Sequence, residues 1–401
     1  MHERRAPIAG RLLTRRGFLA VSAAGAGMLA GCTGTPAASQ EGELRPAQTL
    51  LDDPAPAPER SEVTILMIGD VLVHEGVWRS GEREDGTRDY EHLFAHVADL
   101  VAGADVAIVD QETILGGTAL GLSSYPTFNS PQEIGSAEAA AGFDVVLHAN
   151  NHALDKGMEG IGAELAFWRS EHPEVAVTGM ADSEEAAGEI PLLERGDRRI
   201  AVLSYTYGTN GISLPADAPW AVRMLDDAQV EKDFSLAWER GADAVVVCPH
   251  WGTEYAAGPD DDQRRWAERF VELGADVILG CHPHVLQPVE ELVAPDGRVV
   301  PVFWSLGNFV SGQARKDTMV GGLAQVTLAF EGDARRVASW QITPLVTHRA
   351  SGVDYTTYPL ADYTEELAEV NHVRTVSGQT DFSRQWCVDF CAERLGDAFQ
   401  A

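Results

Sequence analysis

The sequence predicts an α/β fold built on a largely parallel β-sheet. Short apolar runs rich in Val, Ile and Leu alternate with longer segments whose apolar residues recur at helical spacing. Several of these runs are followed at once by Asp, Glu, Asn or His, and open α/β sheets bind their ligands at the carboxyl ends of the strands. With 401 residues, 45% of them hydrophobic, the chain is long enough for one large domain or two smaller ones.

The first half of the chain supplies four expected strands and three expected helices. The first strand ends in Gly69-Asp70, with His74 four residues on, and the second delivers Asp110 and Glu112. The third is followed by a polar segment, residues 148–157, that contains Asn151 and His152. In order, we expect strand 63–68, helix 90–102, strand 105–109, helix 136–142, strand 144–147, helix 161–168 and strand 175–177.

The second half continues this alternation and then changes character. A Pro-Asp-Gly turn at residues 295–297 lies between two β-rich runs, which is the signal of a hairpin. The runs beyond it are further antiparallel candidates, and the chain is helical from Tyr363 on. The expected elements are strand 199–205, helix 227–240, strand 244–247, helix 260–273, strand 277–279, and β-rich runs 285–293, 298–304, 323–330 and 337–342.

The segment that follows residues 277–279 carries two histidines, His282 and His284, around a proline. Side chains at positions i and i+2 of an extended segment point the same way. We therefore expect both imidazoles to face one point at the carboxyl end of a buried strand. A His-x-His pair alone is a weak signal of a metal site.

Five separate strand ends, however, carry an oxygen or imidazole ligand. Each has an ordinary explanation when taken singly: a helix cap, a turn residue, a surface carboxylate or a core histidine. Their coincidence at one edge of a sheet predicts two borderline divalent cations, such as Mn, Zn or Fe, ~4 Å apart and bridged by a carboxylate. The candidate ligands are Asp70, His74, Glu112, Asn151, His152, His250, His282 and His284.

The N-terminus predicts export and anchoring. Arg15-Arg16 precedes a short apolar run that ends in Leu29-Ala30-Gly31-Cys32. The paired arginines resemble a twin-arginine signal, and the last four residues resemble a bacterial lipobox, whose cysteine is lipidated. A plain signal peptide with an incidental cysteine is the alternative. We expect a signal at residues 1–32, a disordered tether at 33–60, a main domain at 61–350 and a helical extension at 351–401, with the protein lipid-anchored on the extracytoplasmic side of a bacterial membrane.

The net charge limits the ligands that the protein can bind, and the spacing of the cysteines limits the roles that they can have. The chain has 30 basic and 61 acidic residues, a formal charge of −31, which argues against nucleic acid as a ligand. A polyanionic substrate would need help from a metal ion or from arginine. Cys248, Cys281, Cys387 and Cys391 show no zinc-binding spacing, so they are packing residues or disulfides of unknown pairing.

The order of the motifs resembles the calcineurin-like metallophosphoesterases. It is still more similar to the CapA family of bacterial poly-γ-glutamate capsule biosynthesis proteins, over residues 63–312. The matching motifs are Gly69-Asp70 with His74, Glu112, and residues 149–155, 207–210, 250–255, 282–287 and 305–309. The resemblance implies a four-layer α/β/β/α sandwich of the metallophosphoesterase type.

The resemblance also implies roles for individual residues. Asp70, His250 and His284 would serve one metal, and Asn151 and His282 the other. Glu112 would bridge the two metals. His152, with Asn151, would act in catalysis as a general acid or as an orienting group. His74 and Asp155 would be metal ligands or would support them, and the residues expected to contact substrate are Tyr207, Asn210, Trp251, Glu254, Tyr255 and Asn308.

This chain departs from the family patterns at three places. It lacks the Asp-x-His of the phosphoesterases, it has Ala153 where they carry an acidic residue, and Asp110-Gln111-Glu112 stands in place of Asn-Leu-Glu. Three functions are compatible with the motifs. The first is a capsule factor that acts on poly-γ-glutamate, together with other capsule assembly proteins, by amide hydrolysis or transfer. The others are a secreted metal-dependent phosphoesterase and a non-catalytic polymer-binding subunit.

Overall fold

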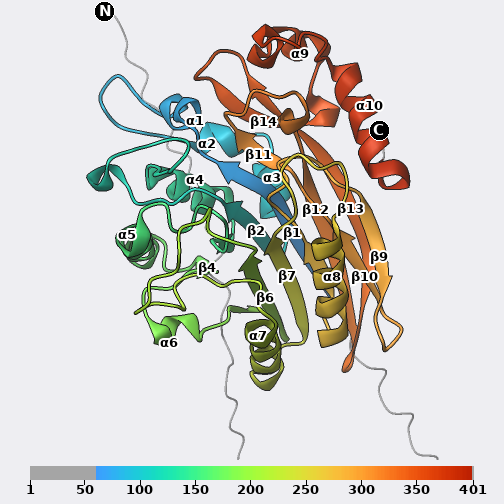
Figure 1. Cartoon of the computed structure of the whole chain (residues 1–401). Helices are drawn as coiled ribbons and strands as arrows, with labels where there is room; N and C mark the ends of the chain where they lie inside the picture. Colours follow the sequence, from blue (N-terminus) through green and yellow to red (C-terminus); the bar gives the residue numbers. More distant parts are fainter. Residues whose placement is uncertain (1–59, 400–401) are drawn as a thin grey trace, which may run out of the picture. The chain divides into compact units, whose positions relative to one another are not determined.

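Two β-sheets lie face to face in the computed structural model, which describes residues 60–399, and helices cover the outer face of each sheet (Figure 1). This is the four-layer α/β/β/α arrangement that the motif resemblance implied. The predicted signal segment, Cys32 and the predicted tether through residue 59 lie outside the described residues. Within residues 60–399, no helix combines the length and the apolar character that a membrane span requires.

The first sheet is centred on β1 (Arg60–Leu72), which pairs in parallel with β2 and antiparallel with β12. Alternate residues of β1 enter different cores: Ile65 and Met67 face the second sheet, and Leu66 and Ile68 face the outer helices. The strand order is β14-β13-β12-β1-β2-β3-β4, with β11 paired to the end of β1. The bounds are β2 Val106–Gln111, β3 Val145–Leu147, β4 Ala176–Thr178, β11 Asn308–Ser311, β12 Val320–Glu331, β13 Ala334–Arg349 and β14 Tyr355–Pro359.

The second sheet has the order β5-β6-β7-β8-β10-β9. Its four inner strands, β6, β7, β8 and β10, are parallel, and β9 and β10 form the antiparallel hairpin expected around the Pro-Asp-Gly turn. Every residue of β7 is buried, as expected for a strand covered on both faces. The bounds are β5 Leu192–Arg195, β6 Arg198–Thr206, β7 Ala244–His250, β8 Val277–Leu279, β9 Val289–Val293 and β10 Val299–Phe303.

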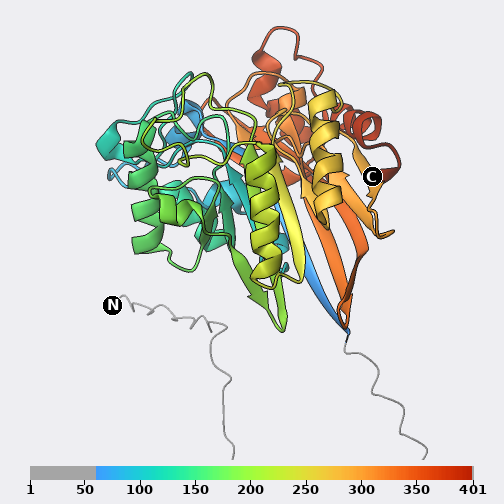
Figure 2. The same ribbon diagram turned by 60° about the horizontal axis from the view of Figure 1, so that its bottom comes forward.

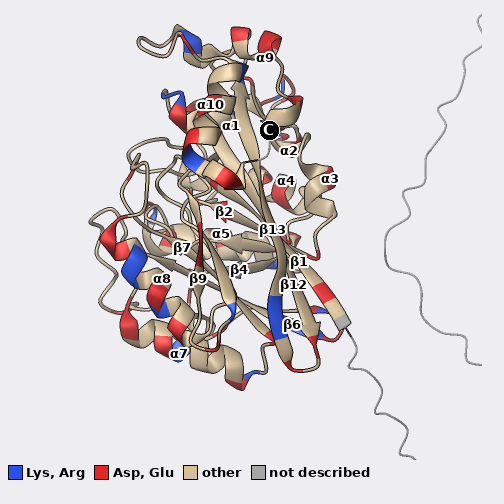
Figure 3. Cartoon of the chain, turned by 90° about the vertical axis from the view of Figure 1, so that its right-hand side faces the viewer, with Lys and Arg blue, Asp and Glu red and all other residues tan. Residues whose placement is uncertain are grey.

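Helices α7 (Asp227–Glu239) and α8 (Asp261–Leu273) cover the outer face of the second sheet (Figure 2). Helix α8 begins with a capping box between Asp260 and Gln263 and ends at Gly274 in the left-handed conformation. Acidic and basic residues share the exposed faces of α7 and α8 (Figure 3), and the ion pairs Arg265–Asp227 and Arg269–Glu231 join the two helices.

The outer face of the first sheet is covered by the N-terminal helices, which build their own core against it. The helix expected over residues 90–102 is interrupted, because Val97 leaves the regular helical geometry with φ −116°. The bounds are α1 Glu75–Ser80, α2 Glu91–Phe94, α3 Ala98–Ala102, α4 Glu133–Ala141 and α5 Gly157–Glu171, with α6 (Glu184–Ala187) following β4.

The C-terminal segment is more than a helical extension. It adds β14 to the edge of the first sheet, next to β13, before α9 (Glu365–Val370) and α10 (Arg384–Leu395). Phe382, Cys387 and Cys391 pack in the same core as the inner face of the sheet. The four cysteines that the structure describes are all free thiols, so the disulfide alternative is not realised here.

Strand β11 was not predicted from the sequence, although it shapes the edge where β1 ends. It pairs in parallel with β1 so that Asp70 lies opposite Asn308. The close approach requires glycine: a Cβ on Gly69 would lie 1.8 Å from the carbonyl oxygen of Gly307. Gly69 therefore allows β1 to end beside the loop that carries Asn308.

Candidate metal centre

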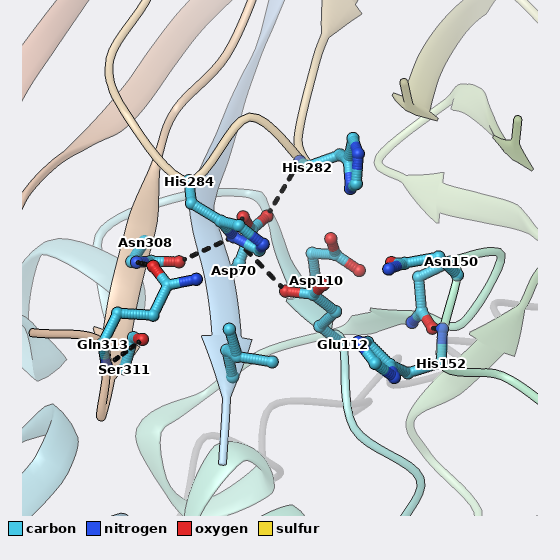
Figure 4. Close-up of polar contacts among 12 residues, drawn as sticks. Asp70, Asp110, Glu112, Asn150, His152, His282, His284, Asn308, Ser311 and Gln313 are labelled. Carbon is cyan, nitrogen blue, oxygen red and sulfur yellow. Dashed lines mark hydrogen bonds and ion pairs between the residues drawn. The ribbon is translucent and has the colours of Figure 1, made fainter. Parts of the chain in front are cut away.

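The predicted ligands converge from two sheets and not from the edge of one. In the first sheet, Asp70 lies near the end of β1, and Glu112 and Asn151 follow β2 and β3. In the second sheet, His250 ends β7 and His282 follows β8. Figure 4 shows how the side chains around Glu112 point toward one another. The site is thus assembled where the carboxyl ends of β1, β2, β3, β7 and β8 meet.

Glu112 occupies the middle of this group. Its side chain is fully buried, and neither carboxylate oxygen has a hydrogen-bond partner. Oε1 lies 3.6 Å from His250 Nε2, and Oε2 lies 3.7 Å from His284 Nδ1. Burial raises the pKa of Glu112, and the nearby carboxylates of Asp70 and Asp110 raise it further. Either a proton or a cation between its oxygens and the histidines would stabilise a carboxylate in this position.

On one side of Glu112, two side-chain oxygen atoms lie beside His284. Its Nδ1 lies 2.9 Å from Asp70 Oδ2 and 3.0 Å from Asn308 Oδ1. Burial opposes the ionisation of Asp70, but the hydrogen bond and charge of His284 outweigh it and lower the pKa of Asp70. The Asn308 amide donates to Gln313 Oε1 and to the carbonyl of Thr318, so its Oδ1 must face His284. Asn308 is fully buried, so its surroundings do not favour the substrate contact predicted for it.

On the other side, His250 lies with Asn151. The distance from His250 Nε2 to Asn151 Oδ1 is 2.8 Å, and the Asn151 amide donates to Asn210 Oδ1 at 3.2 Å. The structure thus places His250 Nε2 beside Asn151, whereas the resemblance implied a grouping of His250 with Asp70 and His284. His250 ends β7 of the second sheet, and the packing of the sheets places its Nε2 opposite the loop after β3.

His282 also belongs to the buried group. Its ring centroid lies 4.8 Å from that of His250 and 5.7 Å from that of His284. Burial, reinforced by His250 and His284, lowers the pKa of His282, so the ring is neutral, and its Nδ1 has no hydrogen-bond partner. A neutral imidazole with a free lone pair is the form that binds a metal ion.

The backbone that presents these histidines is not extended, as the i, i+2 argument assumed. His282 and His284 have φ values of 96° and 60°, in the left-handed region. Asn210 and Tyr255 are the other non-glycine residues with positive φ in the described part of the chain, and both also lie at this site. Such conformations cost of order 1–3 kcal/mol each and concentrate at functional sites.

His152 is held by Asp155. Its Nδ1 lies 2.7 Å from Asp155 Oδ2, which also accepts the backbone N–H of Phe128. The Phe128 ring packs edge-on against His152, and the Asn210 amide nitrogen lies 3.4 Å from both ring nitrogens. Asp155 thus orients His152 and lies outside the groups that could hold a metal.

His74 is also outside those groups. Its Nδ1 lies 3.2 Å from the backbone nitrogen of Gly312, and its ring packs edge-on against Phe128. Burial lowers the pKa of His74 to about 4, so the ring is neutral near pH 7. His74 therefore packs against the loop after β11 and stabilises it.

Two tyrosines form the exposed rim. Tyr207 is 46% exposed, and its ring centroid lies 4.6 Å from that of His282. The ring centroids of Tyr255 and His284 lie 6.1 Å apart, and the Tyr255 hydroxyl accepts a hydrogen bond from Gln313. The Arg315 guanidinium lies 4.4 Å from the centroid of the Tyr255 ring. Glu254 is exposed beside them.

Trp251 is different from these rim residues. It is 1% exposed and stacks on Trp304 in the outer core of the second sheet, where its Nε1 donates to the Trp304 carbonyl. This environment does not favour the substrate contact that the resemblance implied for Trp251.

The donor set fits divalent metal ions. Glu112, His282 and His284 offer ligand atoms that all lie within 4.8 Å of one another, as do Asp70, Asp110 and Cys281. Carboxylate, amide and imidazole donors suit Mn, Fe or Zn. The contribution of Asp110 was missed from the sequence, although its i, i+2 spacing from Glu112 was a usable signal.

The comparison with known families agrees with these motifs. The family model of the bacterial capsule synthesis protein PGA_cap matches residues 64–313. The chain belongs to this family. The match covers all the strand ends that build the centre, from β1 to β11.

Two relatives of this PGA_cap protein carry names that refer to the biosynthesis of PGA or of a capsule. The PGA biosynthesis protein CapA of Bacillus subtilis is 34% identical over 219 residues, which is 52% of each chain. The capsule biosynthesis protein CapA of Bacillus anthracis is 28% identical over 289 residues, 69% of this chain and 66% of that protein. The chain therefore spans about half the length of the first relative and about two thirds of the second.

Solved structures show more distant similarity. The Haemophilus influenzae NAD nucleotidase has a TM-score of 0.47 at 12% identity, covering 84% of this chain and 60% of that one. The calcineurin-like phosphoesterase YfkN of Bacillus subtilis has a TM-score of 0.43 at 14% identity, covering 71% of this chain and 91% of that one. Both TM-scores are below 0.5, so the fold assignment depends on the sheets and layers of this chain itself.

Proposed function

We propose that this PGA_cap protein acts on poly-γ-glutamate or a related anionic polymer of the cell envelope through a centre of two divalent metal ions. The observation that carries the proposal is Glu112, whose two buried oxygens have no partner and face His250 on one side and His284 on the other. Asp70 and Asn308 complete the His284 side, and Asn151 and His282 complete the other. Mn, Zn and Fe are the candidate metals.

When bound, such ions polarise a carbonyl and lower the pKa of a water molecule. The residues of the chain would supply the rest of an amide hydrolysis or transfer. His152, whose Nδ1 lies 2.7 Å from Asp155 Oδ2, would give a proton to the departing amine as a general acid. The rim tyrosines Tyr207 and Tyr255 would hold neighbouring units of an extended polymer.

The N-terminal sequence supports an anchored, extracytoplasmic location for this chemistry. The twin-arginine pattern at Arg15-Arg16 and the lipobox ending in Cys32 are the features on which this part of the proposal depends. Cys32→Ser should move the protein from the membrane to the soluble fraction. A Cys32→Ser variant that still sediments with membranes after a carbonate wash would argue against the lipid anchor. Other capsule assembly proteins are the expected partners at the membrane.

The central test compares a proposed ligand with a rim residue. His282→Ala should lose at least one metal equivalent, measured by inductively coupled plasma mass spectrometry after dialysis. Tyr207→Phe should keep the full complement, because its hydroxyl lies on the exposed rim and not among the ligands. Full metal occupancy in His282→Ala would contradict the proposed centre.

Substrate assays then separate the three functions. The intact protein is offered poly-γ-glutamate and a chromogenic phosphodiester. Release of glutamyl fragments by the wild type, lost in His282→Ala, supports action on the polymer. Cleavage of the phosphodiester alone would identify a phosphoesterase instead. Binding of the polymer without turnover of either substrate would identify a non-catalytic subunit.

A further inference from the structure

His250 is the proposed ligand whose two ring nitrogens both face an acceptor. Nδ1 lies 2.9 Å from Asp110 Oδ2, and Nε2 lies 2.8 Å from Asn151 Oδ1. Both Asp110 and His250 are 2% exposed. A neutral imidazole carries one N–H, so only one of these two contacts can be an N–H hydrogen bond from the neutral ring.

The orientation of the Asn151 amide is fixed independently of His250. Its Nδ2 donates to Asn210 Oδ1, which forces the carbonyl oxygen of the amide toward His250 Nε2. At Nδ1 the acceptor is a carboxylate, and hydrogen bonds to an ionised acceptor are about twice as strong as those between neutral groups. The neutral ring is therefore most stable with its proton on Nδ1, directed at Asp110.

With the proton on Nδ1, the lone pair of Nε2 faces the space shared by Asn151 Oδ1 and Glu112 Oε1, which lie 2.8 Å and 3.6 Å away. That space holds three lone-pair donors and no hydrogen-bond donor among these contacts. Asp110 reaches His250 from the opposite sheet, since it lies on β2 and His250 ends β7. The contact thus fixes a ring of the second sheet against the first.

We propose that Asp110 is the positioning residue that holds His250 in the Nδ1–H tautomer, with Nε2 directed at the metal centre. The inference rests on the metal part of the proposed function. Asp110 does not touch the reacting atoms; it acts through His250. Carboxylates behind metal-bound histidines fix the tautomer and ring orientation, and their removal commonly weakens metal affinity 10- to 100-fold.

Two substitutions separate positioning from simple packing. Asp110→Asn keeps the shape and an oxygen acceptor for Nδ1–H, but without the charge. Asp110→Leu removes the acceptor. Glu138→Leu is the matched control, because Glu138 is another fully buried carboxylate of the same half of the molecule and lies outside the candidate ligand groups.

The first measurement is the tautomer of His250 in the full-length, metal-free protein, read from proton–nitrogen correlation spectra after selective labelling of histidine with nitrogen-15. At a pH at which the ring is neutral, the wild type and Glu138→Leu should carry the proton on Nδ1. In Asp110→Leu the proton should move to Nε2, where Asn151 Oδ1 accepts it. An Nδ1–H tautomer in Asp110→Leu would overturn the proposal.

The second measurement is zinc affinity by competition with a chelating dye. The dissociation constant should rise about 100-fold in Asp110→Leu and about tenfold in Asp110→Asn, with no change in Glu138→Leu. Wild-type affinity in Asp110→Asn would overturn the proposal even if Asp110→Leu does not fold. A wild-type protein that binds no zinc, manganese or iron would instead refute the proposed metal function, and the tautomer measurement would still decide the role of Asp110.

Discussion

Two buried clusters of carboxylates and histidines lie in the same half of the molecule, and each contains a glutamate whose oxygens have no partner. One is the centre around Glu112. The other lies beneath α4 and α5, where Glu138 is unpartnered and His148 Nε2 lies 2.5 Å from Glu164 Oε1. Glu164 is well supported, because it also accepts hydrogen bonds from the Leu115 backbone and from Trp168 Nε1.

The difference between the clusters lies in what surrounds the unpartnered glutamate. Around Glu112, imidazole and amide lone pairs converge from both sheets beneath an exposed rim. Glu138 is fully enclosed, and it is not part of any candidate ligand group among residues 60–399. Burial raises the pKa of Glu138, and the Glu164 charge raises it further, so a proton can neutralise it without a metal. An unpartnered carboxylate therefore indicates a metal only where other donors converge on it.

The largest expected effect separates the two glutamates directly. Glu112→Gln should lose at least one metal equivalent, because the amide cannot bridge two cations as a carboxylate does. Glu138→Gln should keep the full complement. Metal content is measured by mass spectrometry after dialysis of both variants alongside the wild type. Equal metal loss in the two variants would contradict the prediction that Glu112 binds metal and Glu138 does not.

A large effect on stability is expected in the second cluster. Glu164→Ala removes the carboxylate that lies 2.5 Å from His148 Nε2 and leaves the N–H groups of Leu115 and Trp168 without their buried acceptor. Each buried group left unpaired costs about 1–3 kcal/mol of unfolding free energy. Urea denaturation followed by circular dichroism provides the value. The folded variant should still bind metal. A loss below about 1 kcal/mol would show that the His148–Glu164 pair does not stabilise the fold.

The Glu138 carboxyl should also make stability depend on pH. Its pKa is raised in the folded state, so the folded protein holds a proton that the unfolded chain releases above its ordinary value of 4.5. This contribution is fully present below pH 4.5 and is lost as the pH rises through the folded-state pKa. Between the unfolded-state and folded-state pKa values, the unfolding free energy of the wild type should fall more steeply with pH than that of Glu138→Gln. The difference in slope should be up to about 1.4 kcal/mol per pH unit. Parallel slopes for the variant and the wild type would contradict this account.

The smallest effect concerns the thiols behind the centre. Cys281 contacts Asp70, and burial raises the pKa of the Cys281 thiol, which disfavours the thiolate form that binds metal ions. Replacing Cys248 and Cys281 together by Ala should leave metal content unchanged and reduce the unfolding free energy by about 1–2 kcal/mol. A drop in metal content would instead show that Asp70, Asp110 and Cys281 form a true ligand group.

Much of the fold could be predicted from local patterns. The apolar runs at residues 144–147, 244–247 and 277–279 became β3, β7 and β8, and the Pro-Asp-Gly turn became the β9–β10 hairpin. Short elements without a clear periodicity were missed, including β5, β11 and β14. These three strands interrupt their apolar residues with polar ones and so lack the continuous apolar run that identified β3 and β8, and each pairs with a neighbouring strand that supplies its hydrogen bonds.

The sequence by itself determined which chemical groups stand at the ends of the strands, because strand period and turn signals are local properties of the chain. It also determined the family, through motifs that keep their order from Gly69-Asp70 to residues 305–309. Only the tertiary structure decided which groups meet. His250 lies with Asn151 and Asp110 because two sheets pack face to face, and contacts between residues 99 and 140 positions apart leave no local pattern. The left-handed backbone of His282 and His284 was likewise decided by packing, since residues other than glycine adopt that conformation uncommonly.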